Sequence, residues 1–165
     1  MLALVQRVST AAVRVDGAVI GEIGHGLLVF FCAERDDAGA GGGADVPTAS
    51  GAEADRELTR FVQRVLKLRC FADEAGRMNR SVQDVGGGLL VVPQFTLAAD
   101  TASGHRPGFS AAAAPADGQR LYEAFVARLQ ASHPQVATGR FGADMQVSLV
   151  NDGPVTLWLR STPGR

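Results

Sequence analysis

Two short segments that follow apolar strands carry residue types that could do chemistry. The first is Pro93-Gln94-Phe95-Thr96-Leu97, which comes directly after the apolar run 89–92. Proline lacks the N–H that a β-ladder needs, so the strand is expected to stop there. The backbone N–H groups that follow would then be free to face a ligand, as in an oxyanion hole. An ordinary strand end is the alternative interpretation, and the local sequence leaves both open.

The second segment is Asn151-Asp152-Gly153-Pro154-Val155-Thr156, between two further apolar stretches. Asn-Asp-Gly-Pro is a typical turn sequence. A Gly-Pro bond can also be cis, as about 5–6% of X–Pro bonds in folded proteins are. A cis bond would direct the adjacent carbonyl groups the same way and form a rigid, chemically inert wedge. The local sequence does not separate the turn from the wedge.

The familiar catalytic side-chain sets are missing from the sequence. It has no Gly-x-Ser-x-Gly elbow, no phosphate-binding loop and no His-Glu-x-x-His motif. His25, His105 and His133 stand singly beside Gly or Pro, and we expect each of them at the surface. Three converging metal ligands are not found, so no metal or other cofactor is expected. Cys32 lies inside an apolar run and is expected to be a buried thiol rather than a nucleophile.

Apolar patterning predicts the elements that must position these segments. Strands are expected at about 2–8, 12–15, 18–20, 27–32, 69–71, 89–92, 145–150 and 155–159. Asp16-Gly17 is a two-residue hairpin signal. Apolar residues recur at helical spacing over about 53–67 and 115–131, and Pro115 suits the first turn of the second helix. The expected fold is α+β, a curled, largely antiparallel β-sheet or barrel with two main helices.

Length and composition indicate a single domain over residues 1–165. Segment 36–51 is rich in Ala and Gly, offers nothing to bury and predicts a mobile surface loop. A net charge of −1 argues against a protein that wraps a long nucleic acid, but not against one that grips only its end. No apolar run approaches the ~20 residues of a membrane span. With two cysteines and no disulfide framework, a cytoplasmic protein is expected.

Taken together, these segments resemble the D-aminoacyl-tRNA deacylase family, over nearly the whole chain except the 36–51 loop. The resemblance is carried by short motifs in the order of that family: Leu4-Val5-Gln6-Arg7-Val8, Val13-x-Val15-Asp16-Gly17, Gly21-Glu22-Ile23-Gly24, Gly26-Leu27-Leu28-Val29, Met78-Asn79-x-Ser81-Val82-Gln83-Asp84, Pro93-Gln94-Phe95-Thr96-Leu97, Arg106-Pro107-x-Phe109-Ser110, Phe141-Gly142-Ala143-Asp144-Met145-Gln146-Val147 and Asn151-Asp152-Gly153-Pro154-Val155-Thr156. Each motif alone is weak, and their common order is the stronger observation.

The resemblance implies a homodimeric esterase that acts on the aminoacyl-tRNA 3′ end and releases D-amino acids, and glycine mischarged on the alanine tRNA. It implies that the backbone around Phe95 and Thr96, with Gln94 beside it, binds the scissile carbonyl, and that the ribose 2′-hydroxyl of the tRNA assists. Phe141 and Met145 match positions that pack around the terminal adenine. No general base accompanies Thr96 in the sequence, so a nucleophilic role for its hydroxyl is not expected.

The resemblance also implies how the enantiomers are distinguished. Gly153 and Pro154 match a cis pair that enters the partner subunit's site and leaves no room for an L side chain. Arg7 matches the arginine that holds this pair in place.

Pro93 departs from the family, which has Ser there. Proline at this place is characteristic of a related deacylase that tolerates L-alanine, but that relative also has Ala at the position of Phe95 and lacks the arginine. The alternatives are therefore that L-alanine-tolerant deacylase and a non-catalytic module that binds the tRNA end.

Overall fold

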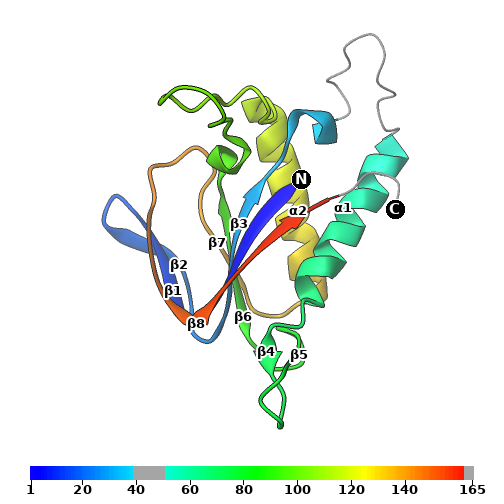
Figure 1. The fold of residues 1–165 in the computed structure, drawn as a ribbon, viewed down its shortest axis with the longest axis vertical. Coiled ribbons are helices and arrows are strands. Elements are labelled where there is room, and N and C mark those ends of the chain that lie inside the picture. The colour runs from blue at the N-terminus through cyan, green and yellow to red at the C-terminus, as the bar shows by residue number, and fades with distance from the viewer. Residues whose placement is uncertain (39–50, 162–165) are drawn as a thin grey trace.

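The computed structural model describes residues 1–38 and 51–161, and its architecture is a curled sheet with helices on one side (Figure 1). The main sheet contains β2, β1, β3, β6 and β7 in that order, with β8 paired to β1. The strand bounds are Leu2–Val15 (β1), Ala18–Ile23 (β2), Gly26–Cys32 (β3), Gly88–Pro93 (β6), Val136–Thr138 (β7) and Gln146–Arg160 (β8). A separate two-stranded sheet is formed by β4, Phe71–Ala72, and β5, Met78–Arg80.

The main sheet is mixed and nearly closed. The pairs β1–β2, β1–β3 and β1–β8 are antiparallel, whereas β3–β6 and β6–β7 are parallel. The two edges curl toward each other, since a Cβ atom on Gly21 of β2 would lie 2.6 Å from the carbonyl oxygen of Thr138 in β7. The expected curled α+β sheet is confirmed, and its parallel part lies at β6.

Apolar side chains cover both faces of the central strands. Helix α1, Gly51–Leu66, and helix α2, Pro115–Ser132, cover one face. Their inward residues pack on the sheet, with Phe31 and Phe125 stacked at 4.5 Å between ring centroids. The other face of β3 and β6, which carries Leu28 and Leu90, packs inside the curl of the sheet. Burial on both faces explains why these strands are unbroken apolar runs.

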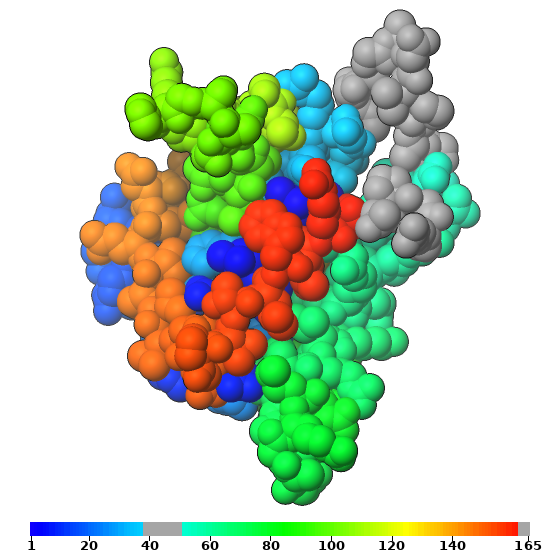
Figure 2. Space-filling view, viewed as in Figure 1, coloured from blue at the N-terminus to red at the C-terminus, as the bar shows by residue number. Residues whose placement is uncertain are grey.

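The local expectations hold within a few residues, apart from three corrections. Asp16 and Gly17 both have positive φ, 51° and 80°, as a two-residue hairpin requires. The strand expected at 69–71 begins only at Phe71. The two strands expected around Asn151–Pro154 are a single strand, β8, that runs across the surface beside β1 (Figure 2). Its pairing with β1 is interrupted between Gln6 and Val8, so this segment is a bulge rather than a turn.

The third correction concerns His133, which was expected at the surface. Its side chain is buried, and its Nε2 lies 2.7 Å from the Gly87 carbonyl oxygen. His25 and His105 are exposed, as expected. Most of the predicted 36–51 loop lies outside the described residues; its first residues belong to a short 3-10 helix, η1, Arg35–Ala38. None of the helices in the described ranges is long and apolar enough to cross a membrane.

Candidate active site

A cavity of about 630 Å³ is lined by the ends of β3 and β6. These strand ends lie at the upper end of the sheet in Figure 1. The strands β3 and β6 form its floor, the start of α2 forms one wall, and the link from β7 to β8 forms another. It brings together four of the predicted site residues: Gln94, Phe95, Phe141 and Met145. Its lining is mostly apolar and aromatic, which suits a small organic ligand such as one nucleotide with its ester.

The short 3-10 helix η2, Phe95–Ala98, presents backbone N–H groups at this end of the sheet. Pro93 pairs in register with Phe31, and the Gln94 N–H donates to the Phe31 carbonyl oxygen at 2.7 Å. The first N–H groups of such a helix have no acceptor within it, and no side chain caps η2. The N–H groups of Phe95 and Thr96 are therefore the donors that this turn offers to a ligand.

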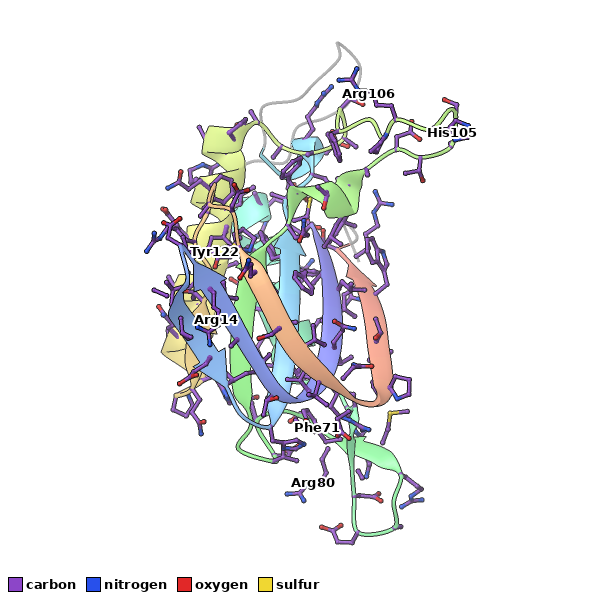
Figure 3. All side chains as sticks on the ribbon, turned by 90° about the vertical axis from the view of Figure 1, so that its left-hand side faces the viewer. Arg14, Phe71, Arg80, His105, Arg106 and Tyr122 are labelled. Atoms are coloured by element: carbon purple, nitrogen blue, oxygen red, sulfur yellow. The ribbon has the colours of Figure 1, made fainter. Side chains whose placement is uncertain are left out.

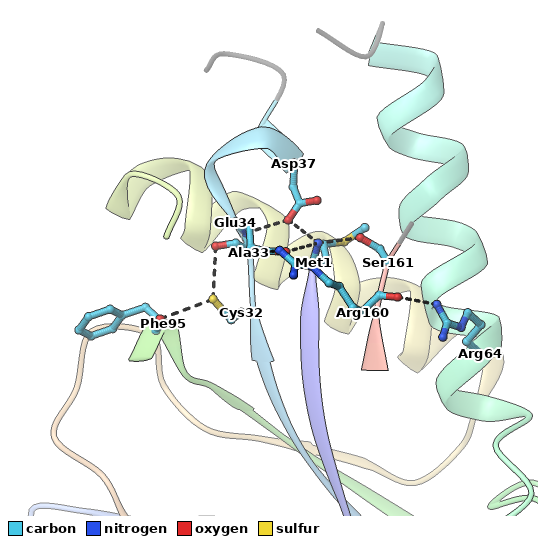
Figure 4. A network of polar contacts seen from close by, with 9 residues as sticks. All are labelled: Met1, Cys32, Ala33, Glu34, Asp37, Arg64, Phe95, Arg160 and Ser161. Carbon is cyan, nitrogen blue, oxygen red and sulfur yellow. Dashed lines mark hydrogen bonds and ion pairs between the residues drawn. The ribbon is translucent and has the colours of Figure 1, made fainter. Parts of the chain in front are cut away.

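Cys32 anchors this turn from β3. Its Sγ lies 3.6 Å from the Phe95 carbonyl oxygen and 3.4 Å from that of Ala33, so the thiol can donate to either (Figure 4). Burial raises the pKa of the Cys32 thiol to about 11. The expected burial of the Cys32 thiol is thus confirmed, and the thiol also forms part of the cavity wall.

The described residues around η2 provide no general base for the Thr96 hydroxyl. That hydroxyl accepts a hydrogen bond from Gln94 Nε2, and an amide cannot take up its proton. Burial also raises the pKa of the Tyr122 hydroxyl, another ionisable group of the lining. The lining also contains a carboxylate, that of the exposed Asp144, and a thiol, that of Cys32. No histidine of residues 1–38 or 51–161 lines the cavity.

Phe141 and Met145 form an apolar wall across from η2. The Phe141 ring lies 6.3 Å from that of Tyr122 between centroids. A Cβ atom on Gly139 would lie 2.8 Å from Met145 Sδ, so glycine allows that side chain to pack close to the backbone. Both residues are half-buried. A flat aromatic face and a polarisable thioether suit a nucleobase, because any base can stack on them.

Arg7, Gly153 and Pro154 lie at the other end of the sheet. Arg7 Nε donates to the Asp152 carbonyl oxygen at 3.0 Å and lies 3.1 Å from Asp152 Oδ2, while its Nη1 donates to the Cys70 carbonyl oxygen at 2.6 Å. The Gly153–Pro154 peptide bond is cis, and both residues are exposed on the bulge of β8. Arg7 thus ties this bulge to the segment that precedes β4.

Strand register gives the separation of the two groups. At one end of the sheet Val8 pairs with Asn151 and with Gly26, which pairs with Gly88. At the other end, Pro93 of β6 pairs with residue 31 of β3. The two ends are therefore five residue steps apart along β6, roughly 16 Å at about 3.3 Å per residue. In Figure 3, Tyr122, which lines the cavity, lies toward the upper end of the sheet, and Phe71, which lines a second hollow together with Arg7, lies at the lower end.

Sequence reasoning missed Phe109 and Tyr122 as residues of the cavity. Phe109 packs edge-on against Phe95, with ring centroids 5.2 Å apart. A single large aromatic residue among the small residues and prolines that follow Arg106 was an available signal. Tyr122 was expected in the core, where its hydroxyl donates to the Val91 carbonyl oxygen at 2.9 Å. No local signal shows that one edge of its ring also faces a cavity.

A network of hydrogen bonds and ion pairs lies at the end of the sheet that carries the cavity (Figure 4). The Met1 ammonium group is buried and contacts Asp37 Oδ2 at 2.6 Å, Ser161 Oγ at 2.6 Å and Glu34 Oε2 at 3.6 Å. Arg160 pairs with Glu34 from the last strand. The network joins the ends of β1, β3 and β8 behind the cavity floor. Within the described ranges, no cluster of His, Cys, Asp and Glu is suited to hold a metal ion.

Two solved structures have this fold. A c-Myc DNA unwinding element binding protein superposes with a TM-score of 0.82 at 34% identity, covering 98% of this chain and 99% of that one. A probable eukaryotic D-amino acid tRNA deacylase superposes with a TM-score of 0.79 at 16% identity, covering 96% and 97%.

Relatives in sequence match over almost the full length. A D-aminoacyl-tRNA deacylase of Aromatoleum aromaticum is 62% identical over 163 residues, 99% of this chain and 97% of that protein. One of Paracidovorax citrulli is 60% identical, covering 99% and 95%. The sequence model of the D-Tyr-tRNA(Tyr) deacylase family matches residues 4–160 of this chain. This chain therefore belongs to the D-Tyr-tRNA(Tyr) deacylase family.

Proposed function

We propose that this protein hydrolyses the ester bond of D-aminoacyl-tRNA, releasing the free D-amino acid and tRNA, and that it also accepts glycine. The observation that carries the proposal is the cavity in which the uncapped N–H groups of η2 face an aromatic wall. The wall suits the terminal adenine and the turn suits the ester carbonyl. Because the chain belongs to the deacylase family, we propose that the ligand bound by the wall and the turn together is the 3′ end of an aminoacyl-tRNA.

The reaction needs little from side chains. Water adds to the ester carbonyl, the resulting oxyanion is held by the Phe95 and Thr96 N–H groups, and the bond to the ribose oxygen breaks with a proton delivered to that oxygen. One well-placed oxyanion donor contributes about 10²–10³ in rate. No histidine in the described part of the chain lines the cavity, and the resemblance to the deacylase family implies that the ribose 2′-hydroxyl of the tRNA assists. That hydroxyl is therefore the group proposed to relay the proton. An aminoacyl ester is already reactive, so positioning and oxyanion stabilisation can suffice.

Discrimination between enantiomers is proposed to come from a second copy of the chain. Gly153 and Pro154 lie roughly 16 Å from the cavity of their own chain, estimated from a strand rise of about 3.3 Å per residue. Both residues are exposed, and Arg7 donates a hydrogen bond to the carbonyl oxygen of the preceding residue, Asp152. In a two-fold dimer that apposes the two ends, the bulge of one chain would fill the cavity mouth of the other and exclude an L side chain. A glycyl ester has no side chain to be excluded, so it would be accepted in the site.

The activity is tested with purified protein and four substrates: D-Tyr-tRNA, L-Tyr-tRNA, Gly-tRNA and L-Ala-tRNA. We expect hydrolysis of the first and third, with L-Tyr-tRNA intact. Comparable hydrolysis of L-Ala-tRNA would assign the protein to the L-alanine-tolerant branch. Binding of tRNA without turnover of any substrate would instead identify a non-catalytic module.

The role of Thr96 is tested by Thr96→Ala, with Thr10→Ala at an exposed position of β1 as the matched control. We expect Thr96→Ala to keep at least about a tenth of the wild-type kcat, because the backbone donor remains when the hydroxyl is removed. Loss of all turnover in a folded variant would restore Thr96 as the nucleophile.

The dimeric site is tested by mixing two variants. Phe141→Ala damages the cavity wall, and Gly153→Ala damages the bulge, since a Cβ atom there would lie 3.0 Å from Arg7 Nη2 at a φ of +136°. A mixed dimer would contain one site with neither defect, so D-selective hydrolysis should exceed that of either variant alone. Monomers in sedimentation equilibrium, or no gain on mixing, would refute the shared site.

A further inference from the structure

We propose that residues 100–108 form an arm that binds the phosphate backbone of the tRNA strand as it leaves the cavity, with Arg106 as the phosphate-binding residue. This inference rests on the proposed function and assigns a part of the molecule that the hydrolytic site does not use. The arm projects from the upper end of the sheet, and Figure 3 shows His105 at its tip and Arg106 on the same arm, nearer the body of the molecule.

The base of the arm is fixed. The Asp100 N–H donates to the Gly108 carbonyl oxygen at 2.7 Å, and the Gly108 N–H donates back at 2.9 Å. Asp100 Oδ1 accepts the Ala102 N–H at 2.9 Å. A closed base of this kind sets the direction in which the arm leaves the sheet.

The same base is joined to the cavity on both sides. Before it stands η2, whose Phe95 lines the cavity. After it stands Phe109, which lines the cavity and packs against Phe95. The following backbone is tied to the end of β3, since the Ala113 N–H donates to the Ala33 carbonyl oxygen at 3.0 Å. The arm is therefore a rim of the cavity.

The tip has the chemistry of a phosphate site. Residues 101–107 are all exposed, and they are small or polar apart from Pro107. The guanidinium group of Arg106 makes no hydrogen bond or ion pair with any residue that the structure describes. Arginine presents a fork of donors that matches phosphate oxygens. A protein partner would instead favour aromatic and apolar contacts, which this tip lacks.

The shape of the site requires such a contact. A cavity of about 630 Å³ accommodates one nucleotide with its aminoacyl group, so the preceding nucleotides must cross the rim. The wall formed by residues 141–145 carries the exposed carboxylate of Asp144, which offsets the charge of the exposed Arg140 just before it. The arm carries a cation and no carboxylate beyond its base. The arm is therefore the side of the rim that favours the phosphate groups of the strand.

Two substrates separate this role from catalysis. One is full-length D-Tyr-tRNA, and the other is the D-tyrosyl ester of adenosine, which fills the cavity but carries no phosphate. Arg106→Ala should raise KM about tenfold on the tRNA, since a hydrogen bond to a charged group is lost, with kcat unchanged and the adenosine ester unaffected. Arg106→Lys should retain part of the affinity. Arg56→Ala, at an exposed position of α1, is the matched control and should change neither substrate.

Salt dependence gives a second measurement. Loss of one phosphate contact should reduce the slope of log Kd against log salt by about 1 for uncharged tRNA. Equal losses of Arg106→Ala on both substrates, or an unchanged KM and slope with tRNA, would overturn the proposal. If the wild-type protein hydrolysed neither substrate, the proposed function would fail, while the Kd of uncharged tRNA for wild type and variant would still decide the role of the arm.

Discussion

Replacement of Arg7 by Met should reduce the discrimination between D- and L-aminoacyl-tRNA more than it reduces hydrolysis of the D substrate. Met keeps an unbranched stem of similar length and removes the charge and all donors. Among the described residues, the polar contacts of the Arg7 side chain are with the carbonyl groups of Asp152 and Cys70 and with the Asp152 carboxylate, and neither residue lines the cavity. The substitution therefore acts through the bulge that carries Gly153 and Pro154.

The magnitude follows from these contacts. A hydrogen bond from a charged donor contributes about 1.5–3 kcal/mol, and the bond to the Asp152 carbonyl group is the one that fixes the bulge. The ion pair with Asp152 adds at most about 1 kcal/mol, since that carboxylate is nearly half exposed. Asn151 Nδ2 still bridges the carbonyl oxygens of Arg7 and Val155 in the variant, at 3.0 and 2.9 Å. We therefore expect a loss of about 1.4–2 kcal/mol in selectivity, which is about 10- to 30-fold.

The assay is the ratio of kcat/KM for D-Tyr-tRNA to that for L-Tyr-tRNA. Arg14→Met is the matched control, because Arg14 lies on the same strand, is exposed and makes a single hydrogen bond, at 3.3 Å to the Gly17 carbonyl oxygen. The control should leave the ratio unchanged. A wild-type ratio in a folded Arg7→Met variant would refute the reasoning, as would an equal fall on both substrates.

Three further predictions concern the cavity and the stability of the fold. Phe141→Ala should raise KM about tenfold or more on both D-Tyr-tRNA and the D-tyrosyl ester of adenosine, since stacking of a base contributes about 1–3 kcal/mol. Asp37→Asn should lower the free energy of unfolding by about 2 kcal/mol, because the buried Met1 ammonium group loses its nearest carboxylate; an unchanged melting temperature would contradict this. The N–H and hydroxyl of Ser81 lower the pKa of Asp84, so its contribution is present above the ordinary Asp pKa and is lost as pH falls through the folded value. Asp84→Asn should thus lose stability at pH 7 and show a shallower acid-induced decline in melts from pH 6 to pH 3.

Much of the fold could be predicted because its signals are local. The helix over Gly51–Leu66 follows from apolar residues at helical spacing, and the hairpin at Asp16-Gly17 follows from residues that tolerate positive φ. The strand end at Pro93 follows from a missing N–H. Each of these features depends on residues within one turn or one strand of each other.

The predictions that were wrong concern features that depend on residues far apart along the chain. The bulge in β8 resembles a turn in the sequence, and only pairing of both halves with β1 shows that the strand continues. His133 is buried because its ring meets the carbonyl group of Gly87, 46 residues away. Of the proposed site, the local sequence singled out both motifs and the resemblance supplied their roles, but the register of the sheet was needed to show that they lie at opposite ends.

The same register explains why proline is tolerated at position 93. In a parallel ladder, successive N–H groups of β6 point alternately to its two neighbours. Gln94 donates toward β3, so the N–H of residue 93 would point toward β7, where the Gly139 N–H already donates to the Val91 carbonyl oxygen. The next acceptor on that side is the Gly139 carbonyl group.

The Tyr122 hydroxyl, whose single proton can be directed to either of two carbonyl oxygens, lies within reach of that acceptor. This hydroxyl lies 3.4 Å from the Gly139 carbonyl oxygen as well as 2.9 Å from that of Val91. β7 has ended at Thr138, so Pro93 removes a rung that the edge of the sheet no longer needs. The Phe95 and Thr96 N–H groups belong to the following turn and keep their direction. Replacement of the usual Ser by Pro93 therefore leaves the proposed carbonyl-binding donors unchanged, and Pro93→Ser should preserve both the rate with D-Tyr-tRNA and the rejection of L-Tyr-tRNA.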